Sequence, residues 1–357
     1  MSVSRSVVAL VGNPTSNNGG AARSWRHAVG LLRRAGASEG FAVRDLTGGD
    51  YDESLTNVRR FLGGALDGTN HLSDAALVIV GGDGMVSLGV NAVAGTGVPL
   101  GIVAVGSGND FARGMSLPRN DVTRSVRGMV HALQSGSTVA VDVAAVTWDE
   151  GGGASHRYVG MLSCGLDAAI NDRANHSRLP GGSLRYLAAV LVEVTRMRRY
   201  GYHLRMTLAD GGGEEGEIIT PLLTVANSRH IGGGIEVSPY SRVDDGVLEV
   251  LWLDHMPRFM EILGALRHVY DGRLPETGLF HWRRVREVRI VRSHGGDEPP
   301  ALMADGERLG RLPVTVRVEP GALRLLASVA PSGAVGPASG RSEPSRPSGG
   351  DGCQRAR

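Results

Sequence analysis

The sequence predicts two consecutive domains of different fold class, an α/β domain with a parallel sheet and then a mostly antiparallel β-sandwich domain. With 357 residues, the chain is longer than one compact core usually requires. Up to about residue 137, short apolar runs alternate with segments of helical spacing, which favours parallel strands covered by helices. Beyond that point, short β-type runs are separated by turn-rich breaks, as in a sandwich or an open barrel. The predicted domains are residues 1–138 and 139–328, followed by a tail at 329–357.

The apolar runs of the first domain are short and bounded by turn residues, as buried strands are. Strands are predicted at residues 7–11, 41–46, 77–80 and 99–105. Helices are predicted between them at residues 20–35, 54–66 and 85–94. Because such strands would be parallel, the loops that follow them would meet at one edge of the sheet.

The second domain has the pattern of many short strands with few helices. Strands are predicted at residues 139–147, 157–163, 202–208, 217–226, 247–253, 285–292 and 314–318, and helices at 184–199 and 259–270. From about residue 330 the sequence is nearly all Ser, Pro, Gly, Ala and Arg. Such a composition cannot bury enough apolar surface to fold, so we expect a disordered tail.

Composition excludes several classes of protein. The net charge is only +2, which disfavours a polycationic nucleic-acid binder, so no nucleic-acid partner is expected. The chain has no lysine, and every permanent positive side chain is therefore a guanidinium. Cys164 lies in an apolar run and Cys353 in the tail, so a disulfide is not expected, which fits a reducing cytoplasm. No run of about 18 apolar residues predicts a membrane span.

The strongest local signal is Gly81-Gly82-Asp83-Gly84, between a buried strand and a helix. Glycines at this place let the backbone approach a ligand, and the amides of the loop and helix start point at an anion. Asp83 would repel a phosphate, so we expect it to orient amides or a magnesium-bound water. A tight strand–helix turn without a ligand is the alternative.

Two further polar, glycine-rich loops follow predicted strands. One is Gly106-Ser107-Gly108-Asn109-Asp110, and the other spans residues 13–20. The alternative for the first is a plain helix cap by Asn109 or Asp110. Three such loops at one sheet edge predict a nucleotide cradle, which makes the first domain a nucleotide-binding one.

Six short motifs occur in order along both halves of the chain. They are Asn13-Pro14-x-Ser16, Gly81–Gly84, residues 106–113, Gly165-Leu166-Asp167-Ala168, residues 232–234 with Pro239 and Asp245-Gly246, and Asp305-Gly306-Glu307. With these motifs the chain resembles the diacylglycerol kinase catalytic-domain family, in its bacterial soluble lipid-kinase branch, over residues 5–328. The resemblance implies transfer of the γ-phosphoryl group of ATP, with Mg²⁺, to the hydroxyl of diacylglycerol or a related lipid, giving phosphatidic acid.

The resemblance also assigns roles to residues. The loops and the resemblance together place these residues at the ATP site: Asn13, Pro14, Thr15, Ser16, Asn17, Arg23, Thr47, Gly81, Gly82, Asp83, Gly84, Met85, Val86, Ser87, Leu88, Ser107, Gly108, Asn109 and Asp110. Arg242, Asp245 and Val247 match a magnesium site made of one side chain and backbone carbonyls. Asp83, Asp110, Asp142 and Asp245 match carboxylates tied to magnesium or to the site's architecture. Asp305 and Glu307 match the acidic pair that supplies the catalytic base.

Several positions depart from the family pattern. Met85 stands where threonine is common, Ser87-Leu88 replaces an Asn-Glu pair, and Asn17-Asn18 replaces a glycine followed by a basic residue. None of the acidic positions is lost, which favours an active kinase.

The chemistry of the acidic pair is consistent with its implied role, since phosphoryl transfer needs a base for the acceptor hydroxyl. Asp305 and Glu307 are two residues apart and lie on the same side of an extended chain. Like charges raise one pKa, which suits a base. The alternative is an ordinary Asp-Gly hairpin with a solvated glutamate, and which of the two acids is the base stays open.

Two other functions remain as alternatives, an NAD kinase, which shares a GGDG loop, and a non-catalytic nucleotide or lipid sensor. For a lipid kinase we expect a cytoplasmic protein, peripheral at the inner membrane face, that visits an anionic membrane surface transiently. Arginines at 196–199 and 283–292 would supply the attraction, unless they form an ordinary solvated face. A homodimer is a further expectation.

Overall fold

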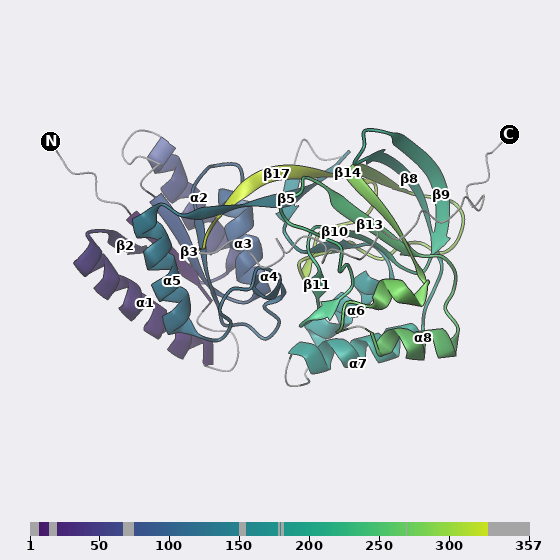
Figure 1. Ribbon diagram of the computed structural model, residues 1–357, viewed down its shortest axis with the longest axis horizontal. Coiled ribbons are helices and arrows are strands. Elements are labelled where there is room, and N and C mark those ends of the chain that lie inside the picture. Colours follow the sequence, from purple (N-terminus) through teal and green to yellow (C-terminus); the bar gives the residue numbers. More distant parts are fainter. Residues whose placement is uncertain are drawn as a thin grey trace, which may run out of the picture.

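The structure, a computed structural model, describes residues 7–13, 20–66, 75–149, 155–177, 179, 182–268 and 270–327. The two halves of the chain lie side by side, with the long strands β5 and β17 running between them (Figure 1). The predicted tail and the loop residues Pro14, Thr15, Ser16 and Asn17 lie outside the described residues.

The N-terminal half is a parallel sheet with helices on both faces. Its strands are β1 (Val7–Gly12), β2 (Ala42–Asp45), β3 (Ala75–Gly81) and β4 (Leu100–Ala104), and its main helices are α1 (Gly20–Glu39), α2 (Tyr51–Leu66), α3 (Asp83–Val93) and α5 (Val122–Ser135). The strand order is β2-β1-β3-β4, and all three pairings are parallel.

Alternate residues of the strands build two apolar layers. Val8, Leu10 and Val78 face one side, where they pack against α1 and α5. Ala9 and Ile79 face the other side and pack against α2 and α3. This alternation is what the pleat of a strand requires when both faces of its sheet are covered.

The C-terminal half is mainly antiparallel β structure. Its strands are β5 (Thr138–Trp148), β6 (Ser155–Tyr158), β7 (Met161–Ser163), β8 (Tyr200–Leu208), β9 (Gly213–Thr220), β10 (Leu223–Ala226), β11 (His230–Ile231), β12 (Ile235–Glu236), β13 (Leu248–Leu253), β14 (Phe280–Arg292), β15 (Met303–Ala304), β16 (Glu307–Arg308) and β17 (Val314–Leu326). Its helices are α6 (Leu166–His176), α7 (Gly182–Val194), α8 (Phe259–Leu266) and the 3-10 turn η3 (Leu274–Thr277). The short helix α4 (Asp110–Gly114) lies between the halves (Figure 1). The predicted fold class is therefore confirmed.

Strand β17 is longer than the sequence predicts, and it joins the two halves into one sheet. It pairs with β14 and with β5, and its end reaches β4 in parallel, with Leu325 opposite Leu100. The prediction ended at residue 318, whereas the strand continues through a register shift between Glu319 and Leu323 that accommodates Pro320 and Gly321.

Strand β5 also belongs to both halves. Val141 and Val143 pack in the apolar layer of the N-terminal half, whereas Ala144 and Val146 belong to the core of the other half. The division between residues 138 and 139 stays a prediction, since the sheet is continuous there. No helix in the described part of the chain combines the length and apolar character needed to cross a membrane.

Candidate active site

The loops that follow β3 and β4 touch each other through their glycine backbones. A Cβ atom on Gly82 would lie 3.1 Å from the Cα atom of Gly106, and one on Gly106 would collide with the backbone of Gly82. The two loops can meet only because neither residue carries a side chain. The structure thus brings the first two predicted loops together at one sheet edge.

Asp83 fixes the geometry of the second loop. One carboxylate oxygen, Oδ2, accepts a hydrogen bond from the amide of Asn109 at 2.8 Å, and Oδ1 accepts one from the amide of Asp110 at 2.9 Å. Asn109 has a left-handed backbone with φ 55°, and its side chain exchanges two hydrogen bonds with Gly106. Burial raises the pKa of Asp83. This carboxylate orients amides, which is one of the two roles expected of it.

Asp110 connects this loop to the C-terminal half. Its Oδ2 and Oδ1 atoms accept hydrogen bonds from the amide of Gly233, at 2.8 and 3.1 Å. The Arg113 guanidinium donates to the carbonyl of the same glycine at 3.4 Å. Burial, followed by repulsion from Asp83, raises the pKa of Asp110 to about 6. Helix α4 is therefore anchored to the segment at 232–234.

The remaining predicted ATP-site residues differ in their surroundings. The Thr47 hydroxyl accepts a hydrogen bond from the amide of Gly12 at 3.2 Å, which ties the loop after β2 to the end of β1. Three predicted residues are exposed: Asn13 directly after β1, Arg23 on the first turn of α1, and Ser107 in the loop after β4. Met85, Val86, Ser87 and Leu88 are buried on α3, so their side chains belong to the core. Gly81 and Gly108 belong to the two touching loops, and a Cβ on Gly108 would strike the Asp83 carboxylate.

The acidic pair lies on the hairpin between β15 and β16, and its two members have different surroundings. Asp305 and Gly306 form the two-residue turn, with φ values of 48° and 84°. The Asp305 carboxylate accepts hydrogen bonds from three successive amides, those of Val159, Gly160 and Met161, at 2.9 to 3.1 Å. Burial raises its pKa to about 7, with a further contribution from the nearby Asp83.

Glu307 points at the start of helix α3. A Cβ on Gly84 would lie 3.2 Å from its Oε1 atom. Within the described residues, no donor forms a hydrogen bond with this carboxylate, and burial raises its pKa. The hairpin turn that the sequence offered as an alternative is present, but its glutamate is half-buried beside the GGDG loop.

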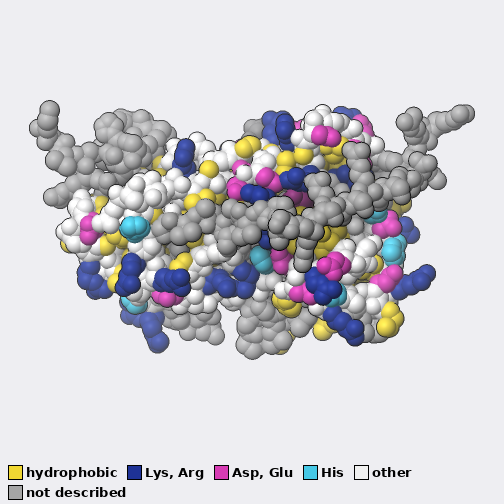
Figure 2. All heavy atoms as spheres, in the orientation of Figure 1, with side chains coloured by type: hydrophobic (Ala, Val, Ile, Leu, Met, Phe, Trp, Pro, Cys, Tyr) yellow, Lys and Arg dark blue, Asp and Glu magenta, His cyan; other side chains and the backbone are white. Residues whose placement is uncertain are grey.

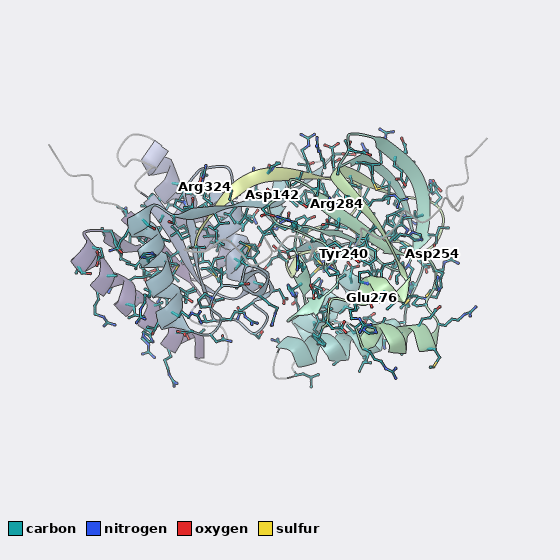
Figure 3. All side chains as sticks on the ribbon, viewed as in Figure 1. Asp142, Tyr240, Asp254, Glu276, Arg284 and Arg324 are labelled. Atoms are coloured by element: carbon teal, nitrogen blue, oxygen red, sulfur yellow. The ribbon has the colours of Figure 1, made fainter. Side chains whose placement is uncertain are left out.

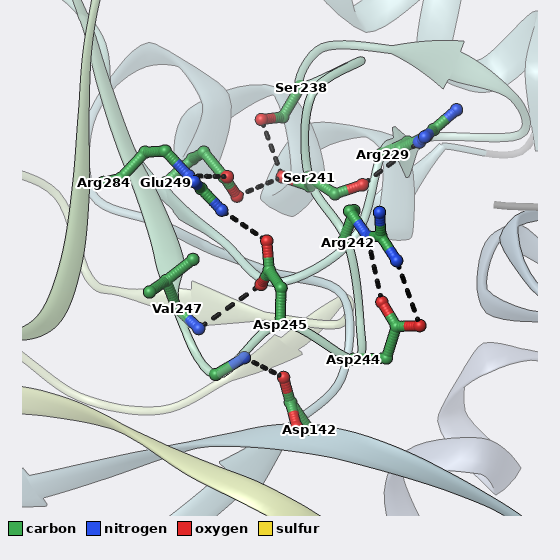
Figure 4. Close-up of polar contacts among 11 residues, drawn as sticks. Asp142, Arg229, Ser238, Ser241, Arg242, Asp244, Asp245, Val247, Glu249 and Arg284 are labelled. Atoms are coloured by element: carbon green, nitrogen blue, oxygen red, sulfur yellow. Dashed lines mark hydrogen bonds and ion pairs between the residues drawn. The ribbon is translucent and has the colours of Figure 1, made fainter. Parts of the chain in front are cut away.

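The residues matched to a magnesium site lie in one loop, as Figure 4 shows. The Arg242 side chain pairs with Asp244 at 3.1 Å, and the amide of Val247 donates to Asp245 Oδ1 at 3.4 Å. The other oxygen of Asp245 is bonded to the Arg284 guanidinium. No group of three or more His, Cys, Asp or Glu side chains in the described ranges could hold a metal. In this arrangement the residues do not fit a divalent ion, because a cation already occupies the carboxylate.

Asp142 connects this loop to the strands that join the two halves (Figure 3). Its carboxylate accepts hydrogen bonds from the amides of Gly246 and Gly321, both at 2.7 Å. Its carbonyl accepts another from Asn227 at 2.9 Å. The match of Asp142 to the site's architecture is consistent with these contacts.

Sequence reasoning missed Glu249, a buried acid within strand β13 that bonds to Ser241 at 2.7 Å. A charged residue inside the apolar run LEVLWL was the available signal. It also missed the amide donors at residues 159–161, which carry no signal because any residue has a backbone amide.

A large hollow of about 720 Å³ lies between α6, α7 and the segment around residues 300–311. Its wall combines apolar side chains such as Ala188, Val192 and Met303 with the exposed cation Arg308 and with the ion pair between Arg173 and Glu193. Arg308 follows Glu307 on β16, but neither Asp305 nor Glu307 lines this hollow.

Comparison with known proteins gives the family. Residues 7–146 match the model of the diacylglycerol kinase catalytic domain, and residues 160–327 match the YegS C-terminal NAD kinase beta sandwich-like domain. A protein named "Diacylglycerol kinase" from Mycobacterium tuberculosis (strain ATCC 25618 / H37Rv) is 29% identical over 323 residues, covering 89% of this chain and 94% of the relative. A "Probable lipid kinase YegS-like" from Chromohalobacter salexigens is 30% identical over 311 residues, covering 85% and 88%.

Solved structures agree in fold. A crystal structure of a diacylglycerol kinase from Bacillus anthracis str. Sterne superposes with a TM-score of 0.61 at 16% identity, covering 90% of this chain and 97% of that one. Both family models, the relatives and the two-half architecture point the same way, and the chain belongs to the diacylglycerol kinase family of lipid kinases, in the branch with a YegS-type C-terminal domain.

Proposed function

We propose that this kinase transfers the γ-phosphoryl group of ATP to the free hydroxyl of diacylglycerol or a closely related lipid, with phosphatidic acid or its analogue as the product. The observation that carries the proposal is the Glu307 carboxylate, which lacks a hydrogen-bond donor among the described residues and faces the N-terminal turn of α3 beside the GGDG loop. That turn is where a phosphate chain would be bound by backbone amides.

Glu307 is the proposed base. It would accept the proton of the lipid hydroxyl as the hydroxyl oxygen bonds to the γ-phosphorus and the bond to the leaving ADP oxygen breaks. Burial raises its pKa, which favours proton uptake. Asp305 has a different proposed role. With three amides bonded to its carboxylate, it positions the hairpin that carries Glu307.

The ATP would lie over the touching loops at 81–84 and 106–110, with Asn13 and Thr47 at its side. Asp83 and Asp110 would hold these loops in shape, since both carboxylates bond to backbone amides. Mg²⁺ supplies charge neutralisation for the triphosphate when it is bound, and we propose that it arrives with ATP.

The lipid would approach through the hollow beside α6 and α7. Its apolar wall suits acyl chains, and the exposed Arg308 suits a polar or anionic headgroup. This hollow supports a lipid acceptor more than a soluble nucleotide acceptor such as NAD.

The two arginine clusters expected at the membrane differ in how many of their side chains are ion-paired. Arg283, Arg289 and Arg292 are paired with Glu214, Asp149 and Glu298, so the 283–292 cluster carries little free positive charge. Arg196, Arg198 and Arg199 are exposed after α7, and no carboxylate in the described part of the chain pairs with them. Leu191 and Val192 are exposed nearby on α7.

We therefore propose that the α7 end contacts an anionic membrane surface, which makes the protein cytoplasmic and peripheral at the inner membrane face. Figure 2 shows further basic side chains along the lower edge of the N-terminal half, over α1 and α5. A homodimer remains a separate prediction.

The test is transfer of labelled phosphate from ATP across a panel of diacylglycerol, a sphingoid base, a glycolipid and NAD. We expect label in the diacylglycerol fraction. Label only in the NAD fraction would favour an NAD kinase, and nucleotide binding without transfer to any acceptor would favour a sensor.

A further inference from the structure

Arg284 on β14 lies between two carboxylates, that of Asp245 in the loop before β13 and that of Glu249 on β13. Its Nη2 atom donates to Oδ2 of Asp245, and its Nε atom lies 3.5 Å from Oε1 of Glu249. The Glu249 side chain is only 1% exposed and that of Asp245 is 18% exposed, whereas the Arg284 side chain reaches solvent. One guanidinium thus neutralises two acids, one of them fully buried (Figure 4).

The placement of Arg284 is set by the sheet. Glu249 on β13 and Arg284 on β14 are direct partners across the antiparallel pair. Such partners have their Cβ atoms about 4.5–5.5 Å apart, so the contact needs no long reach of a flexible side chain. The second oxygen of Glu249 accepts a hydrogen bond from Ser241, which Ser238 contacts in turn at 2.8 Å.

The loop at residues 242–247 is held from both sides. Arg284 bonds to it through Asp245, and Asp142 bonds to it through the amide of Gly246. Asp142 also bonds to Gly321 in the strand that joins the halves. The cation at Asp245 therefore helps to fix the loop against the junction between the two halves.

We propose that the Arg284 guanidinium is the permanent counter-charge of the Asp245 carboxylate in this loop. It takes the place in which the family resemblance predicts a magnesium ion. Magnesium requires about six oxygen ligands in near-octahedral geometry, and the two carboxylates of this loop, Asp244 and Asp245, are each already bonded to a guanidinium. Arginine suits the site because its planar, permanently charged group can bond to two carboxylates at once.

The inference goes beyond the proposed kinase reaction and does not depend on it. It means that the loop at 242–247 keeps its structure without a divalent ion.

The experiment measures melting temperature without nucleotide, in EDTA and in millimolar Mg²⁺ or Ca²⁺, for the parent, Arg284→Gln and Arg283→Gln. Arg283 is the matched control because it precedes Arg284 on the same strand and pairs with the part-exposed Glu214. The parent and R283Q are expected to melt at the same temperature in EDTA and in Mg²⁺.

R284Q is expected to melt roughly 5–10 °C lower than the parent in EDTA, because a buried carboxylate loses its counter-charge. A divalent cation at ten times its Kd should then recover about 2–3 °C, since it can bind the two freed acids. The double variant R284Q/D245N should lose this cation response and regain part of the stability, because it removes one of the like charges.

Three results would overturn the proposal. The first is a parent whose melting temperature falls in EDTA and loses that dependence in D245N, which is the behaviour of a true metal site. The second is R284Q with the stability of R283Q. The third is a destabilised R284Q that no divalent cation restores. If R284Q does not fold, the double variant decides, and its failure to fold would also contradict the proposal.

Discussion

The carboxylate of Glu307 faces Gly84 at the first turn of helix α3, so closely that a Cβ atom on Gly84 would lie 3.2 Å from its Oε1 atom. This contact joins the β15–β16 hairpin of the C-terminal half to the GGDG loop of the N-terminal half. The two members of the acidic pair therefore have different partners, because the Asp305 carboxylate accepts hydrogen bonds from the amides of residues 159–161.

The first prediction concerns the base. Glu307→Gln should lower kcat by roughly 10²–10⁴-fold, because the amide cannot take the proton of the acceptor hydroxyl. The KM for ATP and the melting temperature should change little, since Glu307 forms no hydrogen bond within the described residues. Steady-state kinetics with diacylglycerol checks this, and near-normal turnover of E307Q would remove Glu307 from the mechanism.

The second prediction concerns Asp305 as a positioning residue. Asp305→Asn replaces one acceptor oxygen by a donor that faces backbone N–H groups, and should cost roughly 1–3 kcal/mol in the free energy of unfolding. Activity should fall with the loss of stability, whereas E307Q loses activity alone. Urea unfolding of both variants distinguishes these roles, and a fully stable but inactive D305N would instead make Asp305 the base.

The third prediction concerns pH. The pKa of Asp305 is raised by burial to about 7, so the folded state binds a proton that the unfolded state releases at about 4. The stability that this proton contributes is present below about pH 4 and is lost as the pH rises through about 7. The parent should therefore lose up to about 1.4 kcal/mol per pH unit over this window relative to D305N. Equal pH slopes of unfolding free energy in both proteins would contradict it.

The fourth prediction concerns the contact between the two glycine loops. Gly106→Ala should raise the KM for ATP and lower the melting temperature, because its Cβ collides with the backbone of Gly82. Gly128→Ala is the matched control, since a Cβ there meets nothing within 4 Å in helix α5 and should stabilise by about 0.5–1 kcal/mol. If G106A keeps the parent's KM and melting temperature, the loops tolerate separation and the cradle is misassigned.

The fifth prediction concerns the membrane. Changing Arg196, Arg198 and Arg199 together to Ser should weaken binding to anionic vesicles by roughly 10- to 100-fold, at about 1 kcal/mol per arginine. The same triple change at Arg283, Arg289 and Arg292 removes equal charge but only from ion-paired side chains, so it should have little effect. Co-sedimentation at low and high salt checks both, and equal losses would mean that net charge alone governs binding.

Much of this protein is determined locally, and the sequence alone predicts that part. Buried strands followed by Gly81–Gly84 or residues 106–110 predict the parallel sheet and its loops, because turns, caps and apolar periodicity depend on residues close in the chain. The order of the six motifs by itself indicates the family. For the same reason Asp83 could be expected to orient amides.

The tertiary structure decided what depends on register between distant strands. No local pattern indicates that Glu249 stands opposite Arg284, that Asp305 meets the amides at 159–161, or that β17 continues past Pro320 to reach β4. The sequence therefore placed Arg284 in a surface cluster and left Asp305 and Glu307 equivalent. A charge's role is set by which partner faces it across the sheet, and that partner is chosen by the packing of the whole core, not by the neighbours of the residue in the chain.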